Sequence, residues 1–282
     1  MKNLPYFDYC LKYLSNNDPK IEKVFGRHVH WGYWHDPKLA KLTVDDFAIA
    51  SENLTQFLIG SSGVKNNQTV LDVGCGFGGT IASINERFSG MSLTGLNIDD
   101  RQLERARQLV FATPKNMIQF QQGDACTLPF ADESFDVILA VECIFHFSDR
   151  EVFFREAHRV LKPGGTLAIS DFMINSHFAY VLPRKFNTGF FGVCDVHFSH
   201  SKYRELARRC GYSVALEKNV TKNTLPTYRI LISEVFGKSK FNFFNLLGWI
   251  TTAVIEVISR LDLLRYSVFV FKKNMRTEQP LS

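Results

Sequence analysis

The stretch from Val70 to Gly79 is the part of this chain that most constrains its fold. It reads VLDVGCGFGG, a short run of apolar and β-branched residues followed by four glycines within six positions. The run is typical of a buried strand, and glycine permits a tight turn and close approach of a ligand. We expect a strand that turns into a helix and receives a nucleotide-like ligand. Gly74, Gly76 and Gly79 also satisfy the G-x-G-x-x-G spacing of dinucleotide sites, so this stretch alone leaves the ligand open.

The bulk composition excludes several classes of protein. A length of 282 residues with 45% hydrophobic residues predicts one α/β domain with additional elements and an ordinary core. The net charge of +5 is spread along the chain without a long basic run, so we expect no nucleic-acid partner. The six cysteines show no C-x-x-C spacing, which predicts neither a zinc site nor a disulfide framework and fits a reducing compartment.

The N-terminal residues and the longest apolar stretch bear on export and membrane insertion. Residues Met1 to Ser15 lack the continuous apolar core of a secretory signal, so we expect a cytoplasmic protein. The longest apolar stretch, Phe243 to Ile258, is interrupted by Asn245 and Glu256 and is shorter than the roughly 20 residues of a spanning helix. We expect no transmembrane segment. Trp249, with basic residues flanking the stretch, leaves a weak peripheral membrane contact open.

Strand and helix patterns alternate through the middle of the chain and then stop. This alternation predicts a parallel, doubly wound α/β sheet. Ser148 and Glu151 form a capping box at the start of a helix that we expect to reach Leu161. We expect an N-terminal helical cover over 1–60, a ligand-binding core over 61–171, and a helical lid with the last strands over 172–282. Within the last part, the aromatic-rich segment from Asn175 to Phe198 is expected to form a lid.

Four sequence blocks carry a more specific signal. They are Asp72–Gly78, Gly123–Ala125 with Leu128–Phe130, Phe135–Ile138, and Leu161–Gly165. In order and spacing they resemble the motifs of class I S-adenosylmethionine-dependent methyltransferases, in the branch of tocopherol-type, sugar O-methyl and cyclopropane-fatty-acid-type enzymes. The resemblance implies a Rossmann-like seven-stranded sheet with an antiparallel last strand. It also implies S-adenosylmethionine as cofactor and S-adenosylhomocysteine as product.

The resemblance also implies which residues hold the cofactor. Asp72 would bind its amino group, Asp124 would accept from the adenine amine, and the Ala125 backbone would meet the edge of the ring. The glycine turn would pass the methionyl part and the ribose; its residues are Gly74, Gly76 and Gly78.

Two further cofactor assignments depart from the commonest pattern. Most members end the second strand with an acidic ribose ligand, whereas here the strand ends at Asn97. We therefore assign the ribose to Asn97 and Gln102, with Asp99 as the alternative. The pattern H-x-H-x-G-Y near the N-terminus resembles a cofactor-covering segment, which makes Trp31 and Tyr33 candidate cofactor residues. Core packing is the usual role of such aromatic residues.

Catalysis by methyl transfer requires alignment of the acceptor and, for a hydroxyl, removal of a proton. His146 follows the fourth predicted strand and resembles the histidine base of small-molecule methyltransferases. An imidazole, with an ordinary pKa of about 6.5, suits this role. Asp171 could orient His146 or act as a second base. Glu142 could bind the cofactor or stabilise a carbocation in C-methylation, and a structural role for His146 stays open.

The 26 phenylalanines predict a largely apolar pocket for a small, hydrophobic secondary metabolite. Oxygen is the expected methylated atom, with N- or C-methylation as alternatives. A methyltransferase fold without methyl transfer and an NAD-dependent oxidoreductase are competing hypotheses; the missing acidic ribose ligand disfavours the latter. We expect no metal, since no carboxylate accompanies His197 and His200 at ligand spacing. The sequence leaves open a monomer or a homodimer.

Overall fold

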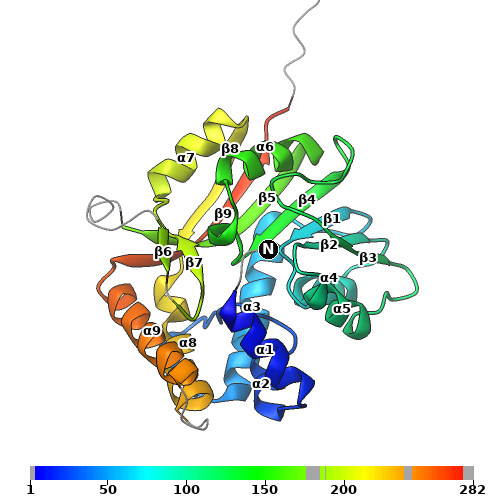
Figure 1. Cartoon of the computed structure of the whole chain (residues 1–282). Coiled ribbons are helices and arrows are strands. Elements are labelled where there is room, and N and C mark those ends of the chain that lie inside the picture. Colours follow the sequence, from blue (N-terminus) through cyan, green and yellow to red (C-terminus); the bar gives the residue numbers. More distant parts are fainter. Residues whose placement is uncertain (1–3, 176–184, 188, 238–242, 276–282) are drawn as a thin grey trace, which may run out of the picture.

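A mixed seven-stranded sheet forms the centre of the chain in the computed structural model, which describes residues 4–175, 185–187, 189–237 and 243–275 (Figure 1). The strand order is β3-β2-β1-β4-β5-β9-β8, and β9 runs antiparallel to both of its neighbours. This confirms the predicted Rossmann-like sheet with an antiparallel last strand. The strands are β1 (Thr69–Val73), β2 (Ser92–Asn97), β3 (Met117–Gln122), β4 (Phe135–Val141), β5 (Leu161–Ile174), β8 (Tyr212–Asn219) and β9 (Leu264–Lys273).

Register places the carboxyl ends of the central strands at one edge of the sheet. Asp72 on β1 pairs with Gly95 on one side and with Leu139 on the other. The three strands are parallel, so β1, β2 and β4 all end on the same side, where open α/β sheets bind ligands.

Successive side chains along each strand point to opposite faces of the sheet, so the core is divided into two clusters, one on each face. Val70 packs in the cluster that contains residues of α3 and α4, whereas Leu71 packs in the cluster that contains residues of α6 and α7. Strands buried on both faces explain why their sequences read as continuous apolar runs. The flanking helices are α3 (Val44–Ser62), α4 (Gly79–Arg87), α5 (Asp100–Leu109), α6 (Arg150–Val160) and α7 (His200–Arg209).

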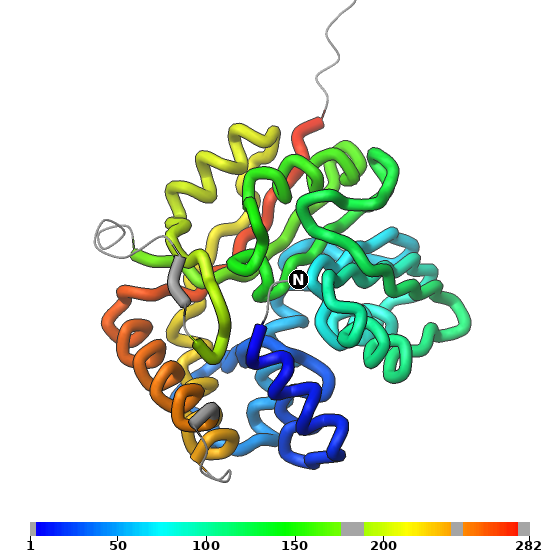
Figure 2. Tube along the Cα trace, viewed as in Figure 1, coloured from blue at the N-terminus to red at the C-terminus, as the bar shows by residue number. Residues whose placement is uncertain are grey.

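Helices from the first and last parts of the chain lie near one another. Figure 2 shows the N-terminal helices near the C-terminal ones, and the Trp34 amide donates to the Asn223 carbonyl at 2.9 Å. The Asn223 side chain donates to the Trp34 carbonyl in return. The segment around Trp34 therefore packs against α8. These elements are α1 (Pro5–Ser15), α2 (Pro19–Phe25), the 3-10 turn η1 (Pro37–Leu39), α8 (Thr221–Ile230), the π-helix η4 (Leu231–Phe236) and α9 (Phe243–Arg260).

The expected lid is only partly described. A two-stranded antiparallel hairpin, β6 (Lys185–Asn187) with β7 (Val193–Asp195), lies within the predicted segment. Residues 176–184 and 188 of that segment lie outside the described residues.

The prediction of Ser148 as a helix cap is wrong. The chain leaves the 3-10 turn η2 (Ile144–His146) and stays extended through Asp149, whose carboxylate accepts from the Glu151 and Val152 amides at 2.7 and 3.1 Å. The Ser148 hydroxyl instead donates to the Cys126 sulfur. Asp149 is therefore the N-cap of α6, which begins at Arg150.

This reassignment makes a stability prediction. Asp149→Ala leaves two amides at the start of α6 without their carboxylate and is expected to lower the free energy of unfolding by about 1 kcal/mol. Ser148→Ala, the matched control, should change it by less than about 0.5 kcal/mol. Urea unfolding followed by circular dichroism measures both, and an equal loss in the two variants would contradict the reassignment.

Candidate active site

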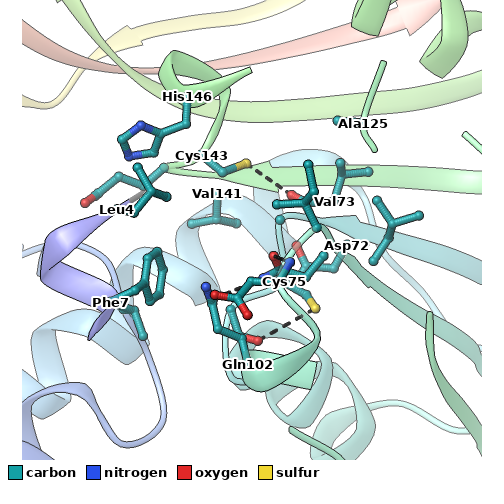
Figure 3. Close-up of a pocket in the computed structure, with 18 of the residues that line it drawn as sticks. Leu4, Phe7, Asp72, Val73, Cys75, Gln102, Ala125, Val141, Cys143 and His146 are labelled. Atoms are coloured by element: carbon teal, nitrogen blue, oxygen red, sulfur yellow. Dashed lines mark hydrogen bonds between the residues drawn. The ribbon is translucent and has the colours of Figure 1, made fainter. Parts of the chain in front are cut away.

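A cavity of about 740 Å³ opens at the carboxyl ends of β1, β2 and β4. In the view of Figure 3, His146 and Leu4 lie toward its upper left, while Asp72, Cys75 and Gln102 lie lower. Segments far apart in sequence therefore converge on one cavity. Its lining includes Leu4, Tyr6, Phe7, His28, Asp72, Gly74, Gly76, Gly79, Asn97, Gln102, Asp124, Ala125, Glu142, Cys143 and His146.

The glycine turn has the backbone conformation that its sequence predicts. Gly74, Gly76 and Gly78 all have positive φ, at 74°, 54° and 82°. A Cβ at Gly74 would lie 2.7 Å from the Cβ of Cys143, and one at Gly79 would lie 2.4 Å from the Arg27 carbonyl oxygen. Side chains at either position would therefore collide with the walls. Gly74 and Gly76 line the cavity, whereas Gly78 is the N-cap of α4 and is not among the lining residues.

Asp72 is the most unusual charged group of the site. Its side chain is 1% exposed, lines the cavity, and has no hydrogen-bond partner for either carboxylate oxygen within the described residues. Burial raises its pKa to about 7, and the nearby Thr80 hydroxyl opposes this rise. A buried carboxylate whose oxygens accept no well-formed hydrogen bond fits a cationic ligand group such as the amino group of S-adenosylmethionine.

The end of β2 presents amides to the cavity rather than a free carboxylate. The Asn97 amide donates to Gln102 Oε1 at 3.1 Å, and both side chains are buried in the lining. Asp99 also lines the cavity, but its carboxylate accepts from the Arg101 guanidinium at 2.7 to 3.2 Å. The Arg101 guanidinium lowers the pKa of Asp99. This geometry favours Asn97 and Gln102 over Asp99 as ribose ligands.

The predicted adenine contacts lie at another wall of the same cavity. Asp124 is exposed, and its Oδ1 accepts from the Cys126 amide at 2.8 Å, which fixes the side chain after β3. Ala125 is buried beside it. Both residues line the cavity, so the structure brings them together with the glycine turn.

The N-terminal segment lies against the cavity through residues other than the predicted pair. Trp31 and Tyr33 are buried and are not among the lining residues; Tyr33 stacks on Phe57 with ring centroids 5.2 Å apart. His28 and His30 take the lining positions instead. In H-x-H-x-G-Y, the histidines rather than the aromatic residues were therefore the informative signal.

Glu142 joins the end of β4 to two other parts of the chain. Its Oε2 accepts from the Trp31 amide at 2.9 Å and from the Tyr266 hydroxyl at 2.8 Å. Burial raises the pKa of Glu142 to about 8, although both donors favour the ionised form. Its φ of 51° is the left-handed conformation that residues with a Cβ rarely adopt. Trp31 thus contributes to the site through its backbone.

His146 faces the cavity from η2 with both ring nitrogens near oxygen atoms. Nδ1 lies 3.3 Å from the Val193 carbonyl oxygen, and Nε2 lies 3.4 Å from the Tyr6 hydroxyl. A carbonyl can only accept, so Nδ1 carries the proton in the neutral ring and Nε2 offers its lone pair. Tyr6, on α1, was not predicted as a site residue, because 140 residues separate it from His146.

Asp171 lies outside the cavity lining and is fully buried. Its Oδ2 accepts from Arg150 at 3.0 Å and from the Tyr203 hydroxyl. Burial raises the pKa of Asp171 to about 6, opposed by the Arg150 charge. The geometry gives Asp171 a place in a buried charged network rather than beside His146.

Comparisons with known proteins agree with this geometry. A model of the methyltransferase domain matches residues 71–169. Methyltransferase GfsG from Streptomyces halstedii is 34% identical over 221 residues, which is 76% of each chain. This chain belongs to the class I S-adenosylmethionine-dependent methyltransferases. O-methyltransferase resE from Aspergillus sclerotiorum is 30% identical over 212 residues, 75% of this chain and 78% of that protein.

A solved structure extends the likeness to the whole fold. The crystal structure of the cyclase SpnF has a TM-score of 0.74 with 19% identity, covering 98% of this chain and 100% of that one. This likeness shows the fold alone. The methyltransferase family sets aside the NAD-dependent oxidoreductase hypothesis and makes S-adenosylmethionine the cofactor. The described residues hold no group of three His, Cys, Asp or Glu side chains suited to a metal ion.

The buried Asp72 carboxylate predicts opposite effects on stability and binding. Its folded pKa of about 7 exceeds the unfolded value, so its ionisation destabilises the fold increasingly as pH rises toward 7 and fully above it. At pH 8, Asp72→Asn should raise the free energy of unfolding by up to about 4 kcal/mol. It should also weaken S-adenosylmethionine binding about 10- to 100-fold, because a charge-assisted hydrogen bond is lost.

Urea unfolding and calorimetric titration test the two effects together. Asp100→Asn is the matched control, because Asp100 is exposed at the start of α5 and pairs with Arg107. It should alter neither quantity appreciably. Unchanged cofactor affinity in Asp72→Asn would contradict the assigned role.

Proposed function

We propose that this methyltransferase acts on a hydroxyl oxygen of a small, largely hydrophobic metabolite, with His146 as general base. The observation that carries the proposal is that His146 and the glycine turn line one cavity. S-adenosylmethionine, when bound, supplies a methyl group already activated by its sulfonium. The chain's own task is to orient the acceptor, exclude water and take up one proton.

The residues described above fit these tasks. The Val193 carbonyl holds the proton on Nδ1, which leaves Nε2 as the acceptor of a hydroxyl proton. Burial raises the pKa of Tyr6 well above 10, so the phenol stays protonated and donates to Nε2. An acceptor hydroxyl would take the place of this contact. The relative resE bears the name of an O-methyltransferase, which supports oxygen as the methylated atom.

Aromatic side chains behind His146 support a hydrophobic acceptor. Phe191 lies 5.9 Å from the Tyr6 ring and 5.0 Å from Phe190, which in turn lies 5.0 Å from Phe236. None of the three rings is among the lining residues, but Phe191 packs beside Tyr6, which lines the cavity, so the cluster gives this part of the lining an apolar backing. Phe178 and Phe241, which the sequence also suggests for the pocket, lie outside the described residues.

The test is transfer of a labelled methyl group from S-adenosylmethionine to a panel of lipophilic phenols, alcohols, amines and alkenes. Product analysis identifies the methylated atom. Methylation of hydroxyls alone supports the proposal, and methylation of amines or alkenes favours the N- or C-methyl alternative. Cofactor binding without turnover on any class would favour a methyltransferase fold used for another reaction.

Replacing the base should separate chemistry from binding. His146→Gln is expected to lower kcat about 10²- to 10⁴-fold, because general-base catalysis contributes this much. The dissociation constant for S-adenosylmethionine should stay within about twofold, since the proposed base takes no part in cofactor binding. His35→Gln, an exposed histidine outside the lining, is the control. A wild-type kcat in His146→Gln would reject the proposed base.

Glu142 gives the C-methylation alternative its own test. A buried carboxylate in the lining would stabilise positive charge on an alkene acceptor. If carbon is methylated, Glu142→Gln should lower kcat more than His146→Gln does. If oxygen is methylated, the order should be reversed. Single-turnover rates of both variants, measured with saturating cofactor, decide between the two.

A further inference from the structure

The outward side of α9 is apolar along its whole described length. Its exposed hydrophobic residues recur at helical spacing and are 38% to 63% exposed. Among the most exposed residues from 245 to 262, only Arg260 and Asp262 are charged. We call this surface the α9 face; it consists of Leu246, Trp249, Ile250, Val254, Val257 and Leu261.

The inward side of the same helix carries polar residues. Asn245, Thr252 and Ser259, spaced seven residues apart, are 3%, 0% and 5% exposed. The Ser259 hydroxyl lies 3.1 Å from the Tyr228 hydroxyl. A helix on the surface of a globular protein ordinarily buries its apolar stripe and exposes its polar one. On α9 several apolar side chains are exposed while polar ones are buried.

Around the α9 face, basic side chains outnumber the acidic side chains that pair with them. Glu256 accepts from Arg260 at 2.9 Å and pairs with Arg229 at 3.5 Å, so one carboxylate serves two guanidinium groups. Asp262 pairs with Arg265. In sequence, Lys238 and Lys240 directly precede the helix with no acidic residue between them and its start. This balance complements an anionic surface.

The dimensions of the α9 face argue against a second copy of this chain as its partner. An 18-residue helix is about 27 Å long, and a strip about 10 Å wide along it covers roughly 270 Å². A stable dimer buries about 800 Å² on each partner. A lipid surface needs no such area or complementary shape, because apolar side chains enter it individually.

We propose that the α9 face binds the surface of an anionic lipid bilayer, with α9 lying in the interface. No helix in the described part of the chain is long and apolar enough to cross a bilayer, which agrees with a helix that lies flat. Trp249 sits at the headgroup level, the exposed valines and leucines enter the acyl boundary, and Arg229 and Arg260, which share Glu256, contact the headgroups.

The opposite side of α9 packs on the aromatic cluster of Phe190, Phe191 and Phe236. A Cβ at Gly248 would lie 2.6 Å from the Phe236 ring and 3.1 Å from the Phe190 ring. Phe190 contacts Phe191, whose ring lies 5.9 Å from that of Tyr6 in the cavity lining. One helix therefore separates the proposed lipid surface from this cluster. The inference itself does not depend on the acceptor, because lipid binding is measured without turnover.

Vesicle co-sedimentation tests the inference on the full chain. The probes are vesicles of phosphatidylcholine mixed with phosphatidylglycerol, and vesicles of phosphatidylcholine alone. The test variant is Ile250→Gln with Val254→Gln, which keeps good helix formers at both positions. The matched control, Leu39→Gln with Ile49→Gln, removes two exposed apolar side chains from η1 and α3. Circular dichroism checks that both variants fold.

We expect wild type and control to bind anionic vesicles alike and the α9 variant to bind at least about tenfold more weakly. Trp249 emission should shift to the blue on binding, because Trp31 and Trp34 are already buried. Absence of wild-type binding, or equal weakening in both variants, would overturn the inference. A wild-type dimer that only the α9 variant dissociates would assign the face to a second copy instead.

Discussion

The hydrogen bonds to Glu142 hold the active site together. One carboxylate oxygen accepts from the N-terminal segment through Trp31 and from β9 through Tyr266. The Glu142 amide donates to Ser170 on β5, so four parts of the chain meet at one residue. The two donors lower the cost of ionising this buried acid, and loss of either would raise its pKa further. The backbone at Trp31 is therefore tied to the end of β4 at the cavity.

Asp72 stands in contrast to Glu142, although both are buried acids in the same lining. One oxygen of Glu142, Oε2, accepts two hydrogen bonds from the protein, whereas both Asp72 oxygens accept none among the described residues. Burial raises the pKa of both groups. The two residues differ in their hydrogen bonding, because the Asp72 oxygens remain able to accept hydrogen bonds from a ligand. Ionisation of the buried Asp72 carboxyl lowers the free energy of unfolding, and binding of a cationic group there would raise it again.

The sequence predicts the parts of this site that depend on local geometry. Gly74 and Gly76 had to be glycines in a tight turn, whereas the role of Asp72 comes from the resemblance to class I methyltransferases. Contacts between distant segments have no such signal: Tyr6 meets His146 across 140 residues, and nothing in α1 marks it as an active-site helix. Trp31 and Tyr33 illustrate the same limit, because an irregular aromatic segment has no period that shows which side chains face inward. The prediction of Ser148 as the helix cap is wrong for a local reason. Two adjacent residues can each cap a helix, and only the backbone geometry decides which of them does.

The α9 helix connects the surface chemistry of the chain to its interior. Leu247, Ile255 and Ile258 pack on the core, and this packing leaves the exposed apolar residues of the α9 face without a partner within the described chain. Hydrophobic molecules partition into lipid, so an enzyme that methylates one gains from meeting it at a membrane surface. In this chain the helix that faces outward with apolar residues also packs, through Gly248, on Phe236 and Phe190, and Phe190 in turn contacts Phe191. Phe191 lies beside Tyr6, so a continuous series of aromatic contacts joins the inner side of α9 to one residue of the cavity lining.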